Sequence, residues 1–474
     1  MGLAINGWLE KKFELEAHGT TVKRELMAGT ASFLAIAAMP AITPAILKEA
    51  GMDETAVFWA TTLSIIFVAV LYALWVNYPF LGGPSVGVSP WVAAYLVNQL
   101  GVPWQMVLMC TFISGILFVI LSIVGFREKI LGAIPMCLKN AFGAGIGAFI
   151  STVGLINSGI IRVNSKAAFG LELGDLTNIN TLLAVLTVFI IGFFLVRGKQ
   201  GGFLFGIAVF TIIGLFIVDP ATGHKITQAP AGSIISFTNP VKALAPGLFK
   251  ISFSGAETIF SNPVLGLGII LFTIFFIDVF DTIGTLTGLS SLAGYMDEKG
   301  DIPNLTKCFL IDAFGTIFGS LMGVTLVTTY VDSSVGIAEG GRTGLTSLWA
   351  AILFVFTLMF APLFTMVPVG ASSAAVIMIG ALMFKSILKV NLEDFSDAFP
   401  AFLCVFMMPY TGNMGIGILS SIFAYTLLKT FKTVMVGKSK DVEGDILVEE
   451  KPGAMMWVLS VVFIIYIITQ SIEL

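Results

Sequence analysis

Three aspartates lie inside segments that are otherwise apolar, and they are the residues of this sequence best suited to chemistry. Asp278 and Asp281 interrupt the apolar run FFIDVFDTIGT (275–285), and Asp332 follows a run rich in β-branched residues. An ionisable side chain is expensive to place inside a membrane, so such a group marks a functional site by default. A buried carboxylate can carry a proton, or it can accept hydrogen bonds from a solute with adjacent N–H donors.

The spacing of these residues predicts which of them act together. Asp281 and Thr285 are four residues apart and share one helix face. Asp278 lies three residues before Asp281, on an adjacent part of the helix surface. The alternative role is structural, with the carboxylate capping a helix or bonding neighbouring hydroxyls. We interpret Asp281 and Asp332 as functional residues, and both interpretations are equally open for Asp278.

The composition decides the class of protein in which these carboxylates sit. Of the 474 residues, 57% are hydrophobic and 11% are charged, against about 25% charged in soluble domains. The net charge of −4, four scattered cysteines and two histidines exclude a nucleic-acid binder, a disulfide-stapled domain and a His/Cys metal cluster. The chain is therefore predicted to be an all-α polytopic protein of the lipid bilayer.

Apolar segments long enough to approach a membrane span, about 20 residues, form two series of seven. Lysine and arginine orient them, because short cytoplasmic loops collect positive charge. With the N-terminus inside, 18 of the 25 basic residues fall on the inner side and six on the outer side, with Lys139 unassigned. The segments lie near 26–46, 55–77, 82–98, 104–124, 138–156, 181–196, 202–219, 264–289, 308–323, 330–340, 346–366, 371–388, 398–411 and 414–432, with an extra one at 454–472.

The third segment of each series is irregular, and this irregularity indicates where the binding site lies. Residues 82–90 (GGPSVGVSP) disfavour a helix, and residues 324–331 (VTLVTTYV) favour a short strand. These irregular stretches begin 56 and 60 residues after the start of the first span of their series. Seven spans per half predict an inverted repeat, in which paired broken segments form the binding site. The alternative is that proline and glycine merely kink two helices.

Three motifs give the chain a resemblance to a known family. Residues 280–285 (FDTIGT), 327–333 (VTTYVDS) and 340–346 (GGRTGLT) resemble those of the nucleobase–ascorbate transporter superfamily (nucleobase–cation symporter-2), in its AzgA-like purine permease branch. The similarity extends from HGTTV (18–22) to about residue 432. It implies fourteen spans, with short antiparallel strands in segments 3 and 10.

The resemblance also implies a site and a mechanism. Asp281, Asp332, Thr285 and Ser333, the backbone near Val86 and Gly87, and Phe33 as a stacking surface would bind a purine nucleobase. Asp278, Asp281 or Asp332 would carry the coupled proton. No metal and no cofactor besides that proton is expected. A homodimer is also implied. We expect it in the inner (plasma) membrane, with the cytoplasmic N-terminus that the basic residues indicate.

The domain organisation follows from the same resemblance. A core domain would move against a gate domain during transport. The expected parts are a cytoplasmic N-terminal segment (1–25), the core (26–128 and 260–366), the gate (129–250 and 367–432), and a basic linker with an extra apolar helix (433–474).

Several alternatives remain open. Relatives usually carry Glu where this chain has Asp332, so the sequence leaves open which purine is preferred. A transporter of another nucleobase, uracil or xanthine, is an alternative. An inorganic-anion exchanger of the same fold is disfavoured because paired carboxylates would repel anions. A channel or a membrane-embedded enzyme is less consistent with the sequence, since two histidines in polar segments supply neither a catalytic pair nor metal ligands. We therefore expect a transporter that is not an enzyme.

Overall fold

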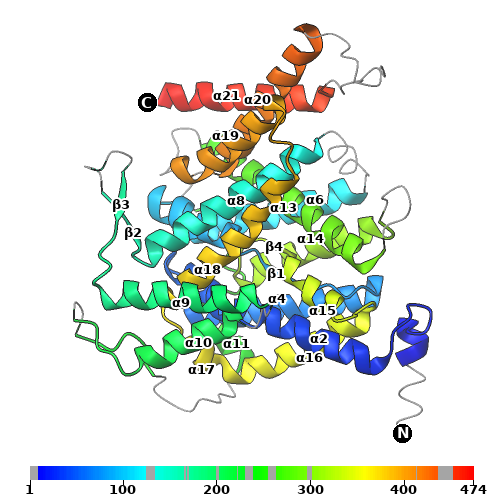
Figure 1. Cartoon of the computed structure of the whole chain (residues 1–474), viewed down its shortest axis with the longest axis vertical. Helices are drawn as coiled ribbons and strands as arrows, with labels where there is room; N and C mark the ends of the chain where they lie inside the picture. The colour runs from blue at the N-terminus through cyan, green and yellow to red at the C-terminus, as the bar shows by residue number, and fades with distance from the viewer. Residues whose placement is uncertain are drawn as a thin grey trace. The chain divides into compact units, whose positions relative to one another are not determined.

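Helices dominate the computed structural model of this chain (Figure 1). It describes residues 9–123, 134–164, 167, 170–198, 202–220, 223–229, 239–254, 263–295, 302–412, 414–435 and 452–473. Within these residues, nine helices are long and apolar enough to cross a membrane. The prediction of a mostly helical, polytopic membrane protein is therefore confirmed, while the count of fourteen spans stays a prediction.

The described chain divides into two units, residues 1–120 with 153–378 and residues 121–152 with 379–474. Every apolar segment expected from the sequence contains helical structure. The division into core and gate domains stays a prediction. The helices that begin in the first unit are α2 (Val22–Ile36), α3 (Met39–Lys48), α4 (Glu54–Leu71), α5 (Val88–Trp91), α6 (Trp104–Ile123), α9 (Ile179–Val196), α10 (Gly202–Gly214), α11 (Pro240–Leu244), α13 (Pro263–Ala293), α14 (Leu305–Met322), α15 (Ser334–Ala338), α16 (Gly344–Thr357), α17 (Ala361–Phe364) and α18 (Val369–Phe384).

The two irregular segments pair with each other at the centre of the first unit. Strand β1 (Gly82–Pro84) runs antiparallel to strand β4 (Val327–Thr329), with Gly83 opposite Thr328. This pairing satisfies backbone groups that the broken helices leave without intrahelical partners. The strands predicted in segments 3 and 10 are therefore confirmed, and Figure 1 shows them enclosed by helices.

Close packing around β1 explains the two glycines at its start. A Cβ atom on Gly82 would lie 2.7 Å from the carbonyl oxygen of Thr328, and one on Gly83 would lie 2.6 Å from the hydroxyl of Tyr330. Such approaches are too short for a side chain, so β1 reaches its partner only because these positions lack one. The Gly-Gly pair thus sets the distance between the two halves of the chain.

Each irregular segment continues as helix after its strand. After β1, α5 (Val88–Trp91) leads into a π-helical stretch (Val92–Gln99). After β4, a 3₁₀ turn (Val331–Ser333) leads into α15 (Ser334–Ala338). Both helical stretches therefore start beside the paired strands, in the arrangement that the repeat predicted.

A β-hairpin outside the two irregular segments was not expected from the sequence. Strands β2 (Ile161–Val163) and β3 (Leu171–Leu173) pair antiparallel between α8 and α9. All side chains of β2 and β3 are at least partly exposed, and Arg162 on β2 pairs with Glu172 on β3. A strand of three residues is too short for a period-two pattern to reveal, which is why sequence reasoning missed it.

The second unit is built around the antiparallel pair α19 and α20. Its helices are α8 (Met136–Asn157), which continues into the first unit, α19 (Phe395–Thr411), α20 (Met414–Met435) and α21 (Ala454–Glu473). The extra apolar segment is thus a helix, and Phe463 on α21 packs against Phe423 on α20. The basic linker expected before it lies mostly outside the described residues, at 436–451.

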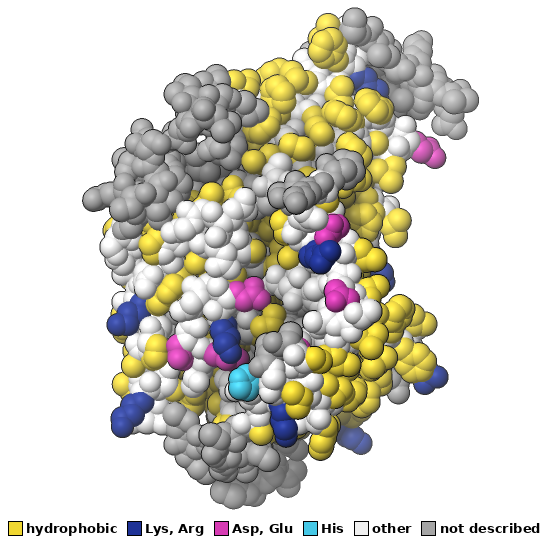
Figure 2. Space-filling view, turned by 90° about the vertical axis from the view of Figure 1, so that its left-hand side faces the viewer, with side chains coloured by type: hydrophobic (Ala, Val, Ile, Leu, Met, Phe, Trp, Pro, Cys, Tyr) yellow, Lys and Arg dark blue, Asp and Glu magenta, His cyan; other side chains and the backbone are white. Residues whose placement is uncertain are grey.

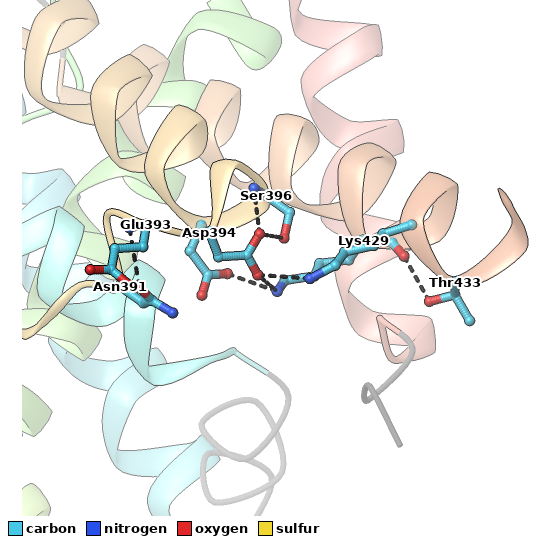
Figure 3. Close-up of polar contacts among 8 residues, drawn as sticks. Asn391, Glu393, Asp394, Ser396, Lys429 and Thr433 are labelled. Carbon is cyan, nitrogen blue, oxygen red and sulfur yellow. Dashed lines mark hydrogen bonds and ion pairs between the residues drawn. The ribbon is translucent and has the colours of Figure 1, made fainter. Parts of the chain in front are cut away.

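An ion-pair cluster joins the start of α19 to the end of α20 (Figure 3). Asp394 accepts hydrogen bonds from the backbone N–H and hydroxyl of Ser396, and from the ammonium groups of Lys429 and Lys432 at 3.1 and 3.0 Å. Lys429 also lies 3.0 Å from a carboxylate oxygen of Asp397. Burial raises the pKa of Asp394, but these hydrogen bonds outweigh it and hold that pKa well below its usual value.

Candidate functional site

Asp281 lies where the two broken segments meet. It belongs to α13 (Pro263–Ala293), and its side chain is partly exposed. One carboxylate oxygen accepts a hydrogen bond from the hydroxyl of Thr328 at 3.1 Å and from that of Ser85 at 3.4 Å. Thr328 lies on β4 and Ser85 directly follows β1. One carboxylate is therefore held by both halves of the chain.

Hydrogen bonds across the strands fix these two hydroxyls. The backbone N–H of Ser85 donates to the carbonyl of Leu326 at 2.7 Å, which extends the β1–β4 ladder by one bond. The hydroxyl of Ser89 donates to the carbonyl of Ser85 at 2.9 Å and lies 3.0 Å from the hydroxyl of Thr325. The residues around Asp281 are thus positioned by backbone as well as side-chain contacts, as a preorganised site requires.

Asp332 lies at the start of the helical stretch after β4. Its side chain is partly exposed, and it sits in the first turn of the 3₁₀ segment. Both Asp332 and Asp281 interact electrostatically with the phenol of Tyr330, whose hydroxyl donates to the carbonyl of Pro84 at 2.9 Å. Tyr330 thus lies within electrostatic range of both predicted carboxylates, and it anchors the second broken segment to the first.

Ser333 has partners within the protein. Its hydroxyl accepts a hydrogen bond from the backbone N–H of Leu81 at 2.9 Å and lies 3.3 Å from the carbonyl of Leu81. The side chain is fully buried. In this structure, the hydroxyl expected to contact the substrate joins the helical stretch after β4 to the start of β1.

The other predicted site residues occupy different surroundings. Val86 and Gly87 are buried at the turn between β1 and α5, and Thr285 is buried one helical turn beyond Asp281. Phe33 on α2 is partly exposed and packs edge-on against Phe354 at 4.9 Å. Their roles in binding stay predictions.

Asp278 is fully buried and has a contact on its own helix. The hydroxyl of Thr282, one turn along α13, lies 3.4 Å from a carboxylate oxygen of Asp278. This contact is compatible with the structural role that the sequence left open, although proton coupling through Asp278 stays a prediction. Among the described residues, no group of three His, Cys, Asp or Glu side chains is placed to hold a metal ion.

Sequence reasoning missed Asp312, a carboxylate that supports the site. It is fully buried on α14 and accepts hydrogen bonds from the backbone N–H and hydroxyl of Thr329, at 3.2 and 2.7 Å. The hydroxyl of Tyr72 lies 2.5 Å from that of Thr329. Asp312 therefore anchors β4 next to Thr328, and its apolar sequence context could have signalled it by the same rule that found Asp281.

Glu25 was also missed, and it explains the motif at 340–346. Its fully buried carboxylate accepts hydrogen bonds from the backbone N–H groups of Arg342, Thr343 and Thr346 at 2.9, 3.2 and 3.2 Å. The hydroxyls of Thr343 and Thr346 donate to the same carboxylate at 2.8 and 2.7 Å. Glu25 on α2 therefore caps the N-terminus of α16, where a negative charge is favourable.

A comparison with protein families covers the whole of this site. The family model described as the permease family (Xan_ur_permease) matches residues 23–422, which include all three motifs and the whole Asp281 site. The chain belongs to the nucleobase–ascorbate transporter family. Membership of this permease family confirms the resemblance seen in the sequence, and it makes the chain a multi-pass membrane transporter and not an enzyme.

Two relatives match the chain of this nucleobase–ascorbate transporter over nearly its whole length. Adenine permease AdeP of Escherichia coli is 32% identical over 458 residues, covering 97% of both chains. Guanine/hypoxanthine permease PbuG of Bacillus subtilis is 33% identical over 466 residues, covering 96% of this chain and 98% of the relative. Both relatives carry purine substrates in their names.

A solved structure supports the fold. The transmembrane domain of the cyanobacterial bicarbonate transporter BicA superposes with a TM-score of 0.57 at 17% identity, covering 84% of this chain and 97% of that domain. At this identity the likeness concerns architecture alone. The helical transporter fold expected from the sequence is thereby confirmed.

Proposed function

We propose that this protein takes up a purine nucleobase of the adenine, guanine or hypoxanthine class by proton-coupled alternating access. The observation that carries the proposal is the Asp281 carboxylate, held by Thr328 and Ser85 between the paired segments. The names of the permeases from Escherichia coli and Bacillus subtilis support the substrate class.

The chemistry of Asp281 suits a neutral heterocycle. A carboxylate accepts hydrogen bonds at two oxygens, and the hydroxyls of Thr328 and Ser85 both donate to a single oxygen of Asp281, Oδ2. Neighbouring N–H groups of a purine could therefore donate to the carboxylate while Thr285 contacts the ring edge. An anion would be repelled by Asp281 and Asp332, which argues against the anion-exchanger alternative.

Proton coupling follows from the same carboxylates. Asp281, Asp332 or Asp278 would bind a proton from outside as the base binds, and both would be released inside, since a low-dielectric site favours the neutral form of an acid. The core would rock against the gate around a fixed site. We place the protein in the plasma membrane with a cytoplasmic N-terminus, as a homodimer.

Uptake into cells tests the proposal directly. Labelled adenine, guanine, hypoxanthine, xanthine and uracil are offered to cells that produce the protein and to cells that lack it, with and without a protonophore. We expect uptake of at least one purine, abolished by the protonophore. Uptake of none of the five bases would defeat the proposal, whereas uptake insensitive to the protonophore would remove proton coupling alone.

The variant Asp281→Asn tests the residue. It keeps the shape of the side chain but removes the charge, and we expect loss of uptake with normal amounts of protein in the membrane. Asp175→Asn, at an exposed aspartate before α9, is the matched control and should transport normally. Full activity of Asp281→Asn would assign this aspartate to a structural role.

A further inference from the structure

A second polar site lies away from Asp281, within the first unit. A cavity with a volume of about 880 Å³ opens where six helix ends converge, those of α3, α4, α8, α9, α17 and α18. This volume lies within the range of small-molecule sites, about 300–1,000 Å³. Its polar lining comes from Thr55, Asn157, Ser158, Asn180, Gln228 and Thr365.

Two carboxylates orient the asparagine side chains of this cavity. The amide nitrogen of Asn157 donates to Glu49 at 2.9 Å, and that of Asn180 donates to Asp219 at 3.0 Å. Burial raises the pKa of Glu49, and the hydrogen bond from Asn157 opposes that shift. An amide carries two donors and an acceptor oxygen, so each asparagine is held in place with hydrogen-bonding capacity beyond its contact with the acid.

The balance of charge in the lining selects the kind of ligand. Lys48 and Glu54 line the wall as an ion pair, with nitrogen and oxygen 2.7 Å apart. The remaining lining is uncharged, and Met366, Val367 and two prolines give it an apolar wall. A neutral, flat solute with donors and acceptors on its edge fits such a surface better than an ion does.

The position of the cavity indicates to which side of the membrane it opens. The six converging helix ends are all ones that the predicted topology places on the outer side. Figure 2 shows the side of the molecule that carries β2 and β3, where charged side chains of both signs and a histidine gather on part of the surface among uncharged atoms. The helices below that part expose apolar side chains instead, such as Phe189 on α9 and Ile212 on α10. A charged, mixed surface of this kind is typical of the part of a membrane protein that meets water, and exposed apolar side chains are typical of the part that meets lipid.

We propose that this cavity is an outer capture site, where a nucleobase binds by hydrogen bonds to the oriented amides of Asn157 and Asn180 before it reaches Asp281. The proposal rests on the proposed function for its ligand class. It adds a second binding site, separate from the carboxylate site, on the transport path. Binding at the capture site would increase the local concentration of base at the outer side of the protein.

Protection of an introduced cysteine tests the capture site. Thr55 is exposed at the start of α4 and lines the cavity, so Thr55→Cys is labelled in intact cells with a membrane-impermeant maleimide. With base at about ten times its dissociation constant, labelling should slow about tenfold. Val163→Cys, on the exposed hairpin strand β2, is the control that should be labelled without protection. Gln228→Cys, also exposed and in the lining, replaces Thr55→Cys if that variant is not produced.

Repeating the labelling in an Asp281→Asn background separates the two sites. Protection should persist there, because the capture site does not include Asp281. Protection that disappears with Asp281→Asn would overturn the proposal, since it would report a movement driven by the central site. Absence of protection by all five bases, or labelling only by a membrane-permeant maleimide, would also overturn it.

Uptake by the same cells distinguishes this proposal from the proposed function. Uptake without protection would remove the capture site and leave the transporter intact. Protection without uptake would leave a base-binding cavity and remove the transport proposal. After labelling at Thr55→Cys, uptake should be blocked, whereas labelled Val163→Cys should transport normally, and full uptake after complete labelling of Thr55→Cys would count against the capture site.

Discussion

Asp281 and Glu25 are both carboxylates in long apolar helices, yet their surroundings differ completely. Glu25 is fully buried and receives hydrogen bonds from five donors. Asp281 is partly exposed, and its carboxylate accepts hydrogen bonds from two hydroxyls, those of Thr328 and Ser85, at 3.1 and 3.4 Å. A carboxylate whose oxygens are occupied by protein donors is therefore structural, and one with few protein donors can serve a ligand, although both lie in helices of a membrane protein.

The largest effect is expected at Glu25. In Glu25→Ala, three backbone N–H groups at the start of α16 lose their acceptor, which should cost at least about 3 kcal/mol of stability. Thermal unfolding in detergent measures the loss, and Glu25→Gln, which keeps one acceptor oxygen, should fall between wild type and Glu25→Ala. In the same assay Asp281→Asn should change the Tm by less than about 2 °C. Equal losses of stability at Glu25 and Asp281 would contradict the assignment of different roles to these two carboxylates.

Asp312 is an intermediate case, because its carboxylate accepts hydrogen bonds from protein donors as Glu25 does, yet it lies beside the Asp281 site. Asp312→Asn should cost about 2 kcal/mol, since an amide nitrogen would face the N–H of Thr329. Uptake per folded molecule should change much less than it does in Asp281→Asn. A normal Tm combined with lost uptake would instead assign Asp312, like Asp281, a role in transport and not in stability.

Asp394 shows that a carboxylate can be fully hydrogen-bonded without being buried. Its side chain is 22% exposed, yet it accepts hydrogen bonds from four donors. Asp394→Asn should lower stability by about 1–2 kcal/mol. The pKa of Asp394 is lower in the folded than in the unfolded state, so its contribution is present above about pH 4 and is lost as the pH falls further. The difference in Tm between wild type and variant should therefore be constant from neutral to weakly acidic pH and shrink below about pH 4. A difference that grows on acidification would contradict this assignment.

Thr328 gives the smallest effect. Thr328→Val removes the hydroxyl that donates to Asp281 and keeps the β-branched shape that suits β4. The loss of one hydrogen bond, about 1 kcal/mol, should change the KM for the base up to about fivefold with little change in Tm. Thr325→Val, which removes a hydroxyl that meets Ser89 and not Asp281, is the matched control. A large loss of stability in Thr328→Val alone would mean that this hydroxyl holds the strand.

Much of this architecture could be predicted from local sequence. The apolar runs located the helices to within a few residues, and the glycines and prolines of 82–90 together with the β-branched run at 324–331 located both strands. These signals are local, because they depend on which residues disfavour or favour helix within a few positions.

The rest depends on contacts between distant parts of the chain. Glu25 lies at the edge of a polar N-terminal segment, and nothing nearby indicates that its partners are more than 300 residues away. The engagement of Ser333 by Leu81 and the register that places Gly83 opposite Thr328 are of the same kind. A single sequence encodes such pairings only through the folded structure, so motif matching could nominate Ser333 but could not find its partner.

The ladder between residues 82–84 and 327–329 has a consequence for biogenesis. While the ribosome is still making the second half, the first half must wait in the bilayer with an unpaired strand edge, whose backbone groups find no water to bond. Its partner emerges more than 240 residues later, which makes this contact highly non-local and slow to form. The nascent chain should therefore become resistant to proteolysis at its centre only after residue 329 has left the insertion machinery.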